Sequence, residues 1–191
     1  MGGTVSLDMA GATIGQTVTL TCVPSEGYRV AQVTGAKVTD NGDNTYSFVM
    51  DNAPVELQIL FLRENNPFLD VNENHFFHES VLWAVENGIT NGIDAEHFGP
   101  MGVCNRAQVV TFLWRAAGSP EPVSTEHPFT DVAAGSFYEK AVLWALENGV
   151  TTGASATTFN PGGECLRAQV VTFLYRADQI PEPEPAPFPD L

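Results

Sequence analysis

Hydrophobic and polar residues alternate with a period of two in short segments of the first 62 residues. The segments are 17–23 (TVTLTCV), 45–50 (TYSFVM) and 55–60 (VELQIL), and Asp40-Asn41-Gly42-Asp43 supplies a turn before the second segment. Such alternation places every second side chain on the same face of a β-strand. With about six short strands expected, this region is predicted to be a small β-sandwich-like module packed on one face.

The spacing of hydrophobic residues becomes helical after residue 66, and the helical pattern occurs twice. The motifs PFLDV, LWAVENGITNG and NRAQVVTFLWRA return 61 positions later as PFTDV, LWALENGVTTG and LRAQVVTFLYRA. Each copy predicts a helix, a loop and a second helix, with helices at 77–87, 106–117 and 167–177. Gly88 and Gly149 are expected to end the first helix of each copy, while Phe98 and Phe159 attach the loop to the core.

These patterns predict an α+β protein in separate domains. A small all-β N-terminal module is followed by an all-α tandem of helix-loop-helix repeats, and proline-rich runs act as stiff linkers. The predicted boundaries are 1–62 for the β module, 63–66 for a linker, 67–122 for the first repeat, 128–183 for the second repeat and 187–191 (PFPDL) for the start of a third repeat.

Residues 67–183 resemble the S-layer homology family of bacterial surface proteins. The resemblance is carried by PFxDV, by LWAxENG with the following [IV]TxG, and by RAQVVTFL[WY]RA, all present in both copies. It implies non-covalent binding to a secondary cell-wall polysaccharide, often with pyruvylated sugars, in grooves between adjacent repeats. It also implies three repeats around a pseudo-threefold axis, whereas only two are complete here. Residues 3–62 are similar to small β repeat modules of such proteins, which act as spacers or display units.

The charge balance narrows the classes of partner. The chain has 23 acidic and 8 basic side chains and a formal net charge of −15, which is the wrong sign for a nucleic-acid-binding surface. The sequence has no apolar run long enough to span a membrane, so we predict no membrane partner. Catalytic triads and phosphate-binding loops lack local support, so we predict neither an enzyme nor a bound cofactor.

The cysteines and histidines predict no metal site. Cys22, Cys104 and Cys165 are odd in number and contain no CxxC pair, so they indicate neither a disulfide framework nor a zinc site. Cys104 and Cys165 recur in an apolar context and are expected to be small buried thiols. The stretch beginning at Asp70 lacks the glycine and glutamate of a calcium-binding loop, and the histidines do not recur between the copies.

Arg106 and Arg167, in the first turn of the second helix of each copy, are the leading candidates for ligand binding. A positive charge at this position opposes the helix macrodipole at a cost of roughly 0.3–1 kcal/mol. Arginine is suited to bidentate capture of a carboxylate such as a pyruvyl group, and the helix N-terminus adds N–H donors. An internal salt bridge is the alternative. Arg115 and Arg176 lie near helix C-termini, where a cation is favourable, and are expected to be structural.

The remaining candidates for glycan binding also recur in both copies. A tryptophan can stack on a sugar ring, although on an amphipathic helix it is more often part of the core. An aspartate just before a helix usually shapes a turn, and its carboxylate can instead accept sugar hydroxyl groups. The predicted set consists of Trp83 and Trp144, Asp70 and Asp131, and the motif glycines Gly92 and Gly153.

Helix capping explains part of the RAQ motif without any function. Asn105 and Gln108 fit a capping box, in which each side chain accepts a hydrogen bond from the other residue's backbone N–H. Leu166 replaces the asparagine in the second copy and has no side-chain acceptor. That copy is therefore expected to lose about 1 kcal/mol of capping.

Two functions follow from these observations. The leading hypothesis is that the chain anchors a secreted surface protein to the cell wall, by binding an anionic secondary cell-wall polysaccharide. The alternative is a structural scaffold or adhesin fragment, in which the repeats self-associate and the β module is displayed. The missing third repeat motivates this alternative, because an uncovered apolar face usually finds a partner.

Overall fold

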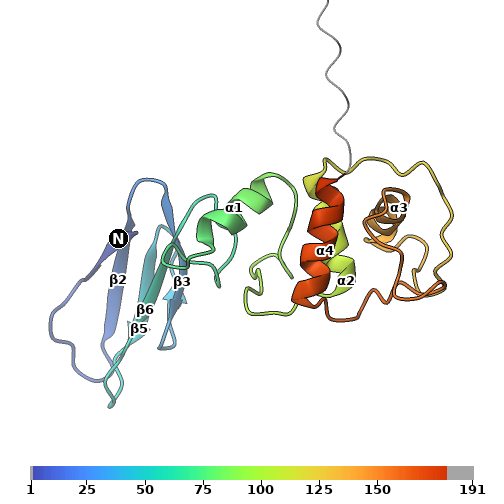
Figure 1. The fold of residues 1–191 in the computed structure, drawn as a ribbon. Coiled ribbons are helices and arrows are strands. Elements are labelled where there is room, and N and C mark those ends of the chain that lie inside the picture. Colours follow the sequence, from blue (N-terminus) through green and yellow to red (C-terminus); the bar gives the residue numbers. More distant parts are fainter. Residues whose placement is uncertain (1, 180–191) are drawn as a thin grey trace, which may run out of the picture. The chain divides into compact units, whose positions relative to one another are not determined.

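The computed structural model describes residues 2–179, with strands in the N-terminal part and helices in the C-terminal part (Figure 1). These residues fall into two compact units: 2–82 with 92–100, and 83–91 with 101–179. The predicted third-repeat start at 187–191 and the predicted end of the second repeat at 180–183 lie outside the described residues. Among residues 2–179, no helix is both long enough and apolar enough to cross a membrane.

Six strands of the described residues form two antiparallel sheets, which confirms a separate β region. The order is β1-β2-β5-β4 in one sheet and β3-β6 in the other. The strands are β1 (Gly3–Leu7), β2 (Thr17–Pro24), β3 (Tyr28–Thr34), β4 (Thr39–Asp40), β5 (Thr45–Val49) and β6 (Gln58–Arg63).

Strand β2 follows the alternation predicted from its sequence. Val18, Leu20 and Cys22 are buried, while their neighbours along the strand are more exposed. Val18 pairs with the buried Phe48 of β5, so apolar side chains from adjacent strands share one face. Strand β6 begins later than the predicted segment 55–60, because its start is fixed by pairing with β3. The period of two identifies a strand but does not locate its ends.

The predicted linker at 63–66 contains a buried polar residue. Asn66 is fully buried, and its side chain accepts a hydrogen bond from the Phe68 N–H at 2.9 Å and donates to the Val71 carbonyl. Arg29 on β3 donates from Nη2 to the Asn66 carbonyl at 3.0 Å. The side chain and the carbonyl of Asn66 therefore both have partners, which fixes the path of the chain as it leaves β6.

Four helices are present in the described part of the repeats: α1 (His78–Glu86), α2 (Arg106–Ala116), α3 (Glu139–Glu147) and α4 (Arg167–Asp178). Gly88 and Gly149 follow α1 and α3 with φ of 68° and 69°, which confirms the predicted left-handed caps. The repeats are not all helical, contrary to the prediction of an all-α tandem. Long loops connect the helices. Each loop is held by side-chain hydrogen bonds, such as those of Asp70 and Asp131, and not by regular backbone pairing.

The core of the second unit joins the two repeats. Helix α2 of the first repeat packs against α3 of the second repeat, and α4 lies beside α2 (Figure 1). The buried residues of this core are Val109, Val110, Phe129, Val132, Ala141, Val142, Trp144, Ala145, Val150, Phe159 and Phe173. Because α2 contributes Val109 and Val110, the second helix of one repeat is covered by the repeat that follows it.

Candidate functional site

Arg106 begins α2 and is held by the second repeat. Its side chain is only 4% exposed, and its Nε donates to the Phe159 carbonyl at 2.9 Å. The guanidinium lies 4.9 Å from the ring centroid of Phe159 and 5.3 Å from that of Phe173. These are cation–π distances, so the charge is partly stabilised by the aromatic faces.

The Arg106 guanidinium is not fully satisfied by the protein. Within residues 2–179, its Nη2 has no hydrogen-bond partner, and no carboxylate forms an ion pair with Arg106. Burial lowers the pKa of the guanidinium, while the charges of Cys165 and Asp131 oppose that shift. A buried charged donor without an acceptor is costly, so this position favours an incoming anion.

A groove of about 250 Å³ lies beside Arg106 and is formed by both repeats. The segment 151–153 of the second repeat forms one side, and α4 forms another. The lining residues, defined here as the Arg106 groove, are Arg106, Thr151, Thr152, Gly153, Ala168, Gln169, Thr172, Phe173 and Arg176. This lining contains two arginines and no carboxylate, so the groove is locally positive in a chain whose formal net charge is −15.

Gly153 is required by the backbone of this groove. Its φ is 90°, a conformation that side chains with a Cβ rarely adopt. A Cβ at this position would lie 2.5 Å from the Phe129 ring and 2.6 Å from the Ser155 carbonyl oxygen. Gly92 has the same role in the first repeat, where a Cβ would lie 2.5 Å from the Phe68 ring. The recurring glycine therefore has a structural cause in both repeats.

Arg167 occupies the equivalent position on α4 but has a different environment. Its side chain is exposed, and within residues 2–179 it forms no hydrogen bond or ion pair. Leu166 supplies no cap, although Gln169 still accepts from the Leu166 N–H at 2.9 Å. In the first repeat both halves of the predicted capping box are present, between Asn105 and Gln108.

Asp70 and Asp131 hold the loops between the helices. Asp70 accepts from the Phe98 and Gly99 N–H groups at 2.9 and 2.8 Å, and Asp131 accepts from Phe159 and Asn160 at 2.8 and 2.7 Å. Burial opposes ionisation of Asp131, but the backbone donors outweigh burial and lower the pKa of its carboxyl. Both carboxylates therefore have a structural role, but they hold a loop 28 and 29 positions further along the chain and do not form the local turn or cap that was predicted.

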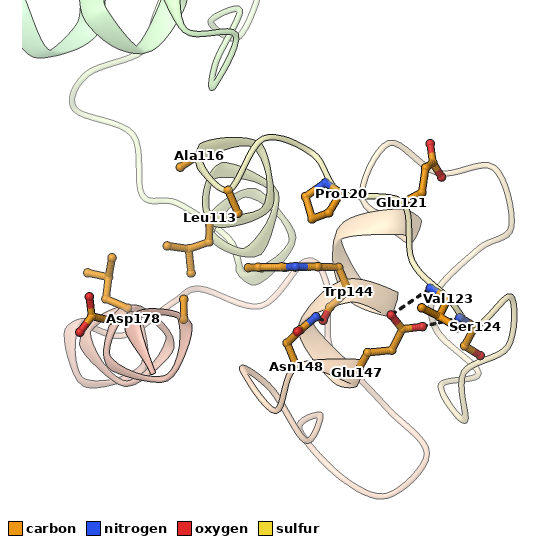
Figure 2. Close-up of a pocket in the computed structure, with 13 residues that line it drawn as sticks. Leu113, Ala116, Pro120, Glu121, Val123, Ser124, Trp144, Glu147, Asn148 and Asp178 are labelled. Carbon is orange, nitrogen blue, oxygen red and sulfur yellow. Dashed lines mark hydrogen bonds between the residues drawn. The ribbon is translucent and has the colours of Figure 1, made fainter. Parts of the chain in front are cut away.

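Trp144 lies in the core and lines a second hollow, of about 1150 Å³, between α2, α3 and α4. Figure 2 shows its indole reaching from α3 towards Leu113 on α2. Glu147, on the same hollow, accepts from the Val123 and Ser124 N–H groups, and Glu121 pairs with Lys140 nearby. Trp144 is only 5% exposed, which matches the expected core role, whereas Trp83 is 56% exposed.

Electrostatics distinguish the two hollows. The hollow in Figure 2 is lined by Glu121, Glu147 and Asp178 and has no basic residue in its lining. It would repel an anionic ligand, while the Arg106 groove would attract one. An anion is therefore expected at Arg106 and not beside Trp144.

The structure brings together only part of the predicted set. Arg106 and Gly153 line one groove, whereas Trp144 lines the other hollow. Sequence reasoning did not single out Thr151, Thr152 or Gln169 as groove residues. The repeated TxG motif was the available signal for the threonines, because it recurs beside Gly153. Arg115 and Arg176 each donate to a carbonyl of their own repeat, that of Ile89 and Val150 respectively, as expected for structural residues.

The described residues do not assemble a metal site. Among residues 2–179, no three or more His, Cys, Asp or Glu side chains are grouped so that they could hold a metal ion.

Two protein families match the chain. Residues 67–110 and 128–171 match the S-layer homology domain, and residues 1–65 match the divergent InlB B-repeat domain. These matches confirm the resemblance that the repeated motifs and the β module indicated. Together they account for both the β region and the paired helices.

Individual relatives match over the repeats. The chain is 28% identical over 102 residues to the surface-layer 125 kDa protein of Lysinibacillus sphaericus, covering 53% of this chain and 8% of that protein. It is 29% identical over 115 residues to a cell surface protein of Thermoanaerobacter kivui, covering 58% and 15%. It is also 29% identical over 118 residues to an endoglucanase of Bacillus sp. strain KSM-635, covering 62% and 12%. The matched part is thus a small share of each relative.

Proposed function

We propose that this chain, whose residues 67–171 form two S-layer homology repeats, attaches a bacterial surface protein to the cell wall by binding an anionic wall polysaccharide. The family match and the two surface proteins among the relatives confirm the predicted location at the cell surface. The matched region occurs both in surface proteins and in an endoglucanase, and it is a small part of each. A region shared by proteins of such different kinds supports a non-catalytic role.

The observation that carries the proposal is the unsatisfied Nη2 of the buried Arg106, at a groove that contains a second arginine. A carboxylate on the polysaccharide, such as that of a pyruvylated sugar, would supply the missing acceptor. It would form a charge-assisted hydrogen bond in a partly desolvated site, where such bonds are stronger than in water. The exposed Thr152, which also lines the groove, would offer its hydroxyl to the sugar ring.

The direct test is co-sedimentation of the full chain with purified wall sacculi, before and after their secondary polysaccharide is chemically removed. We expect the chain to sediment with intact sacculi and to remain in solution with stripped sacculi. Raising the salt concentration should weaken binding, because an exposed anionic polymer is screened by salt. Equal binding to intact and stripped sacculi would show that the polysaccharide is not the ligand.

A negative charge at Thr152 is expected to weaken wall binding without affecting the core. Thr152 is exposed and lines the Arg106 groove, so Thr152→Glu places a carboxylate where the polymer would bind. Repulsion of about 1.4 kcal/mol or more corresponds to at least a tenfold loss of affinity. The matched control is Asn91→Glu, at the equivalent exposed position of the first repeat. Equal losses for both variants would place the site outside this groove.

A second candidate function, self-assembly of the repeats, is favoured by the exposed face of α4. Val110 on α2 is fully buried, whereas its equivalent on α4, Val171, is 60% exposed, and Leu174 is 49% exposed. Trp83 on α1 is also exposed, although its equivalent Trp144 belongs to the core shared with α2. We propose that α4 of one copy receives α1 of a second copy, in the arrangement that α2 and α3 have within the chain. A head-to-tail contact of this kind produces open chains of molecules.

Sedimentation velocity over a range of protein concentrations tests this assembly. We expect the average mass to rise with concentration, and Val171→Lys to remove the increase because it charges the apolar face. The control is Phe76→Lys, which changes a side chain that is 98% exposed elsewhere in the chain. A monomer at all concentrations would exclude self-assembly through α4.

A further inference from the structure

Cys104 and Cys165 face each other across two short antiparallel segments. Asn105 and Glu164 form an antiparallel β-bridge, and the Cys165 N–H donates to the Cys104 carbonyl at 3.0 Å. On the other side of the bridge, the Arg106 N–H donates to the Gly163 carbonyl at 2.9 Å. This pattern places Cys104 directly opposite Cys165, with both side chains on the same face of the pair.

The spacing of such a pair suits a covalent link. Directly opposed residues at a hydrogen-bonded position have Cα atoms about 5.5 Å apart. Disulfides join residues whose Cα atoms are about 4.4–6.8 Å apart. We propose that Cys104 and Cys165 are a redox pair that forms a disulfide between the first and second repeats. The proposal is independent of the wall polysaccharide.

The exposure of the two thiols supports this role. Cys104 is exposed and Cys165 is half-buried, so the expectation of two small buried thiols is wrong for Cys104. Burial raises the pKa of the Cys165 thiol, the nearby Arg106 charge lowers it, and the charge of Cys104 raises it further. The influence of Cys104 agrees with the position of the two residues opposite each other beside the β-bridge.

The oxidation proceeds by thiol–disulfide exchange with a small-molecule disulfide. The Cys104 thiolate attacks one sulfur of the reagent, forming a mixed disulfide and releasing the first reagent thiol. The Cys165 thiolate then attacks the Cys104 sulfur and releases the second reagent thiol. The two cysteines lose two electrons and two protons, and the reagent disulfide is reduced to two thiols. Exposed thiols at a cell surface meet oxidising conditions more often than thiols inside cells.

The disulfide would fix the groove side of the repeat interface. Cys104 precedes Arg106 by two residues, and Cys165 precedes Ala168 of the groove lining by three. The bond would close a loop that spans most of the second repeat, which restricts the unfolded chain strongly. We therefore expect oxidation to raise the unfolding temperature of the repeats by on the order of 5–15 °C.

The test is incubation of the full chain with oxidised glutathione, followed by alkylation, digestion and mass spectrometry without reduction. We expect a peptide containing Cys104 to be linked to one containing Cys165, in a monomer whose mass has fallen by about 2 Da for the two lost hydrogens. Reduction should separate the peptides and lower the unfolding temperature to that of Cys104→Ser.

Two controls make the outcome decisive. Cys22→Ser should leave the link unchanged, because Cys22 is buried in β2 and 3% exposed. Cys104→Ser should abolish the link and the thermal shift together. The proposal is overturned if Cys104 and Cys165 are both alkylated after oxidation, or if Cys104 forms links only between separate chains.

Discussion

Replacement of Phe159 by alanine is expected to destabilise the second compact unit by about 3–5 kcal/mol. Phe159 is fully buried, and its ring centroid lies 5.9 Å from that of Phe129. The Arg106 guanidinium lies over the Phe159 ring, 4.9 Å from the centroid. Removing the ring leaves a cavity that the rigid loop cannot fill by collapse. Since small domains have a net stability of about 5–15 kcal/mol, much of the stability would be lost. Hydrogen exchange of the α3 amides measures the change.

The internal repeat supplies a matched control for this variant. Phe98 is the equivalent residue of the first repeat, and its ring lies 5.8 Å from that of Phe68, but it is only partly buried. We expect Phe98→Ala to cost roughly 1–2 kcal/mol, because less apolar surface returns to water. Similar losses for the two variants would contradict the view that the second loop is buried by both repeats.

The features that could be predicted from the sequence are those set by neighbouring residues. The left-handed glycines Gly88 and Gly149 mark the helix ends, and the buried face of β2 follows its period of two. Asn105 forms the capping box that its spacing from Gln108 indicated. Each of these is decided within a few residues, so local patterns are sufficient.

The different environments of Arg106 and Arg167 could not be predicted in this way. Both residues begin the same motif, RAQVVTFL, and nothing in that motif distinguishes them. Arg106 is buried because the loop containing Phe159 packs over it, whereas Arg167 has no equivalent loop over it in the described residues. Burial here is a property of the repeat that follows and not of the helix itself.

The groove and the cysteine pair were missed for a related reason. Gly153, Arg106 and Arg176 come from three separate segments of the chain, and a repeat alignment shows which residues are equivalent but not which ones are adjacent. Cys104 and Cys165 are equivalent positions of the two copies, yet they also lie opposite each other across a single bridge. The alignment treats the two cysteines as separate equivalent positions, whereas their pairing in the structure is the basis for the proposed disulfide between the repeats.

Arg106→Ala is expected to lower affinity for wall sacculi by about tenfold to a hundredfold, while Arg167→Ala changes it by less than about threefold. The larger figure follows from losing one or two hydrogen bonds to a charged group, each about 1.5–3 kcal/mol before compensation. Arg167 is exposed to solvent and does not line the groove. Its removal takes away only a charge that water and salt already screen, so the affinity changes little. Binding isotherms on sacculi, measured at one fixed salt concentration, give both values.

The stability of each variant separates a binding role for Arg106 from a packing role. Arg106→Ala also removes the bond to the Phe159 carbonyl, so its unfolding temperature should fall, and affinity is therefore compared at temperatures where both proteins are folded. Arg106→Lys keeps the charge but loses the planar fork, and we expect it to bind more weakly than the wild type and more strongly than Arg106→Ala. If Arg106→Ala and Arg167→Ala weaken binding equally, the buried arginine is not the anion site. If neither variant changes affinity while Thr152→Glu does, the ligand contacts the mouth of the groove and not its charged interior.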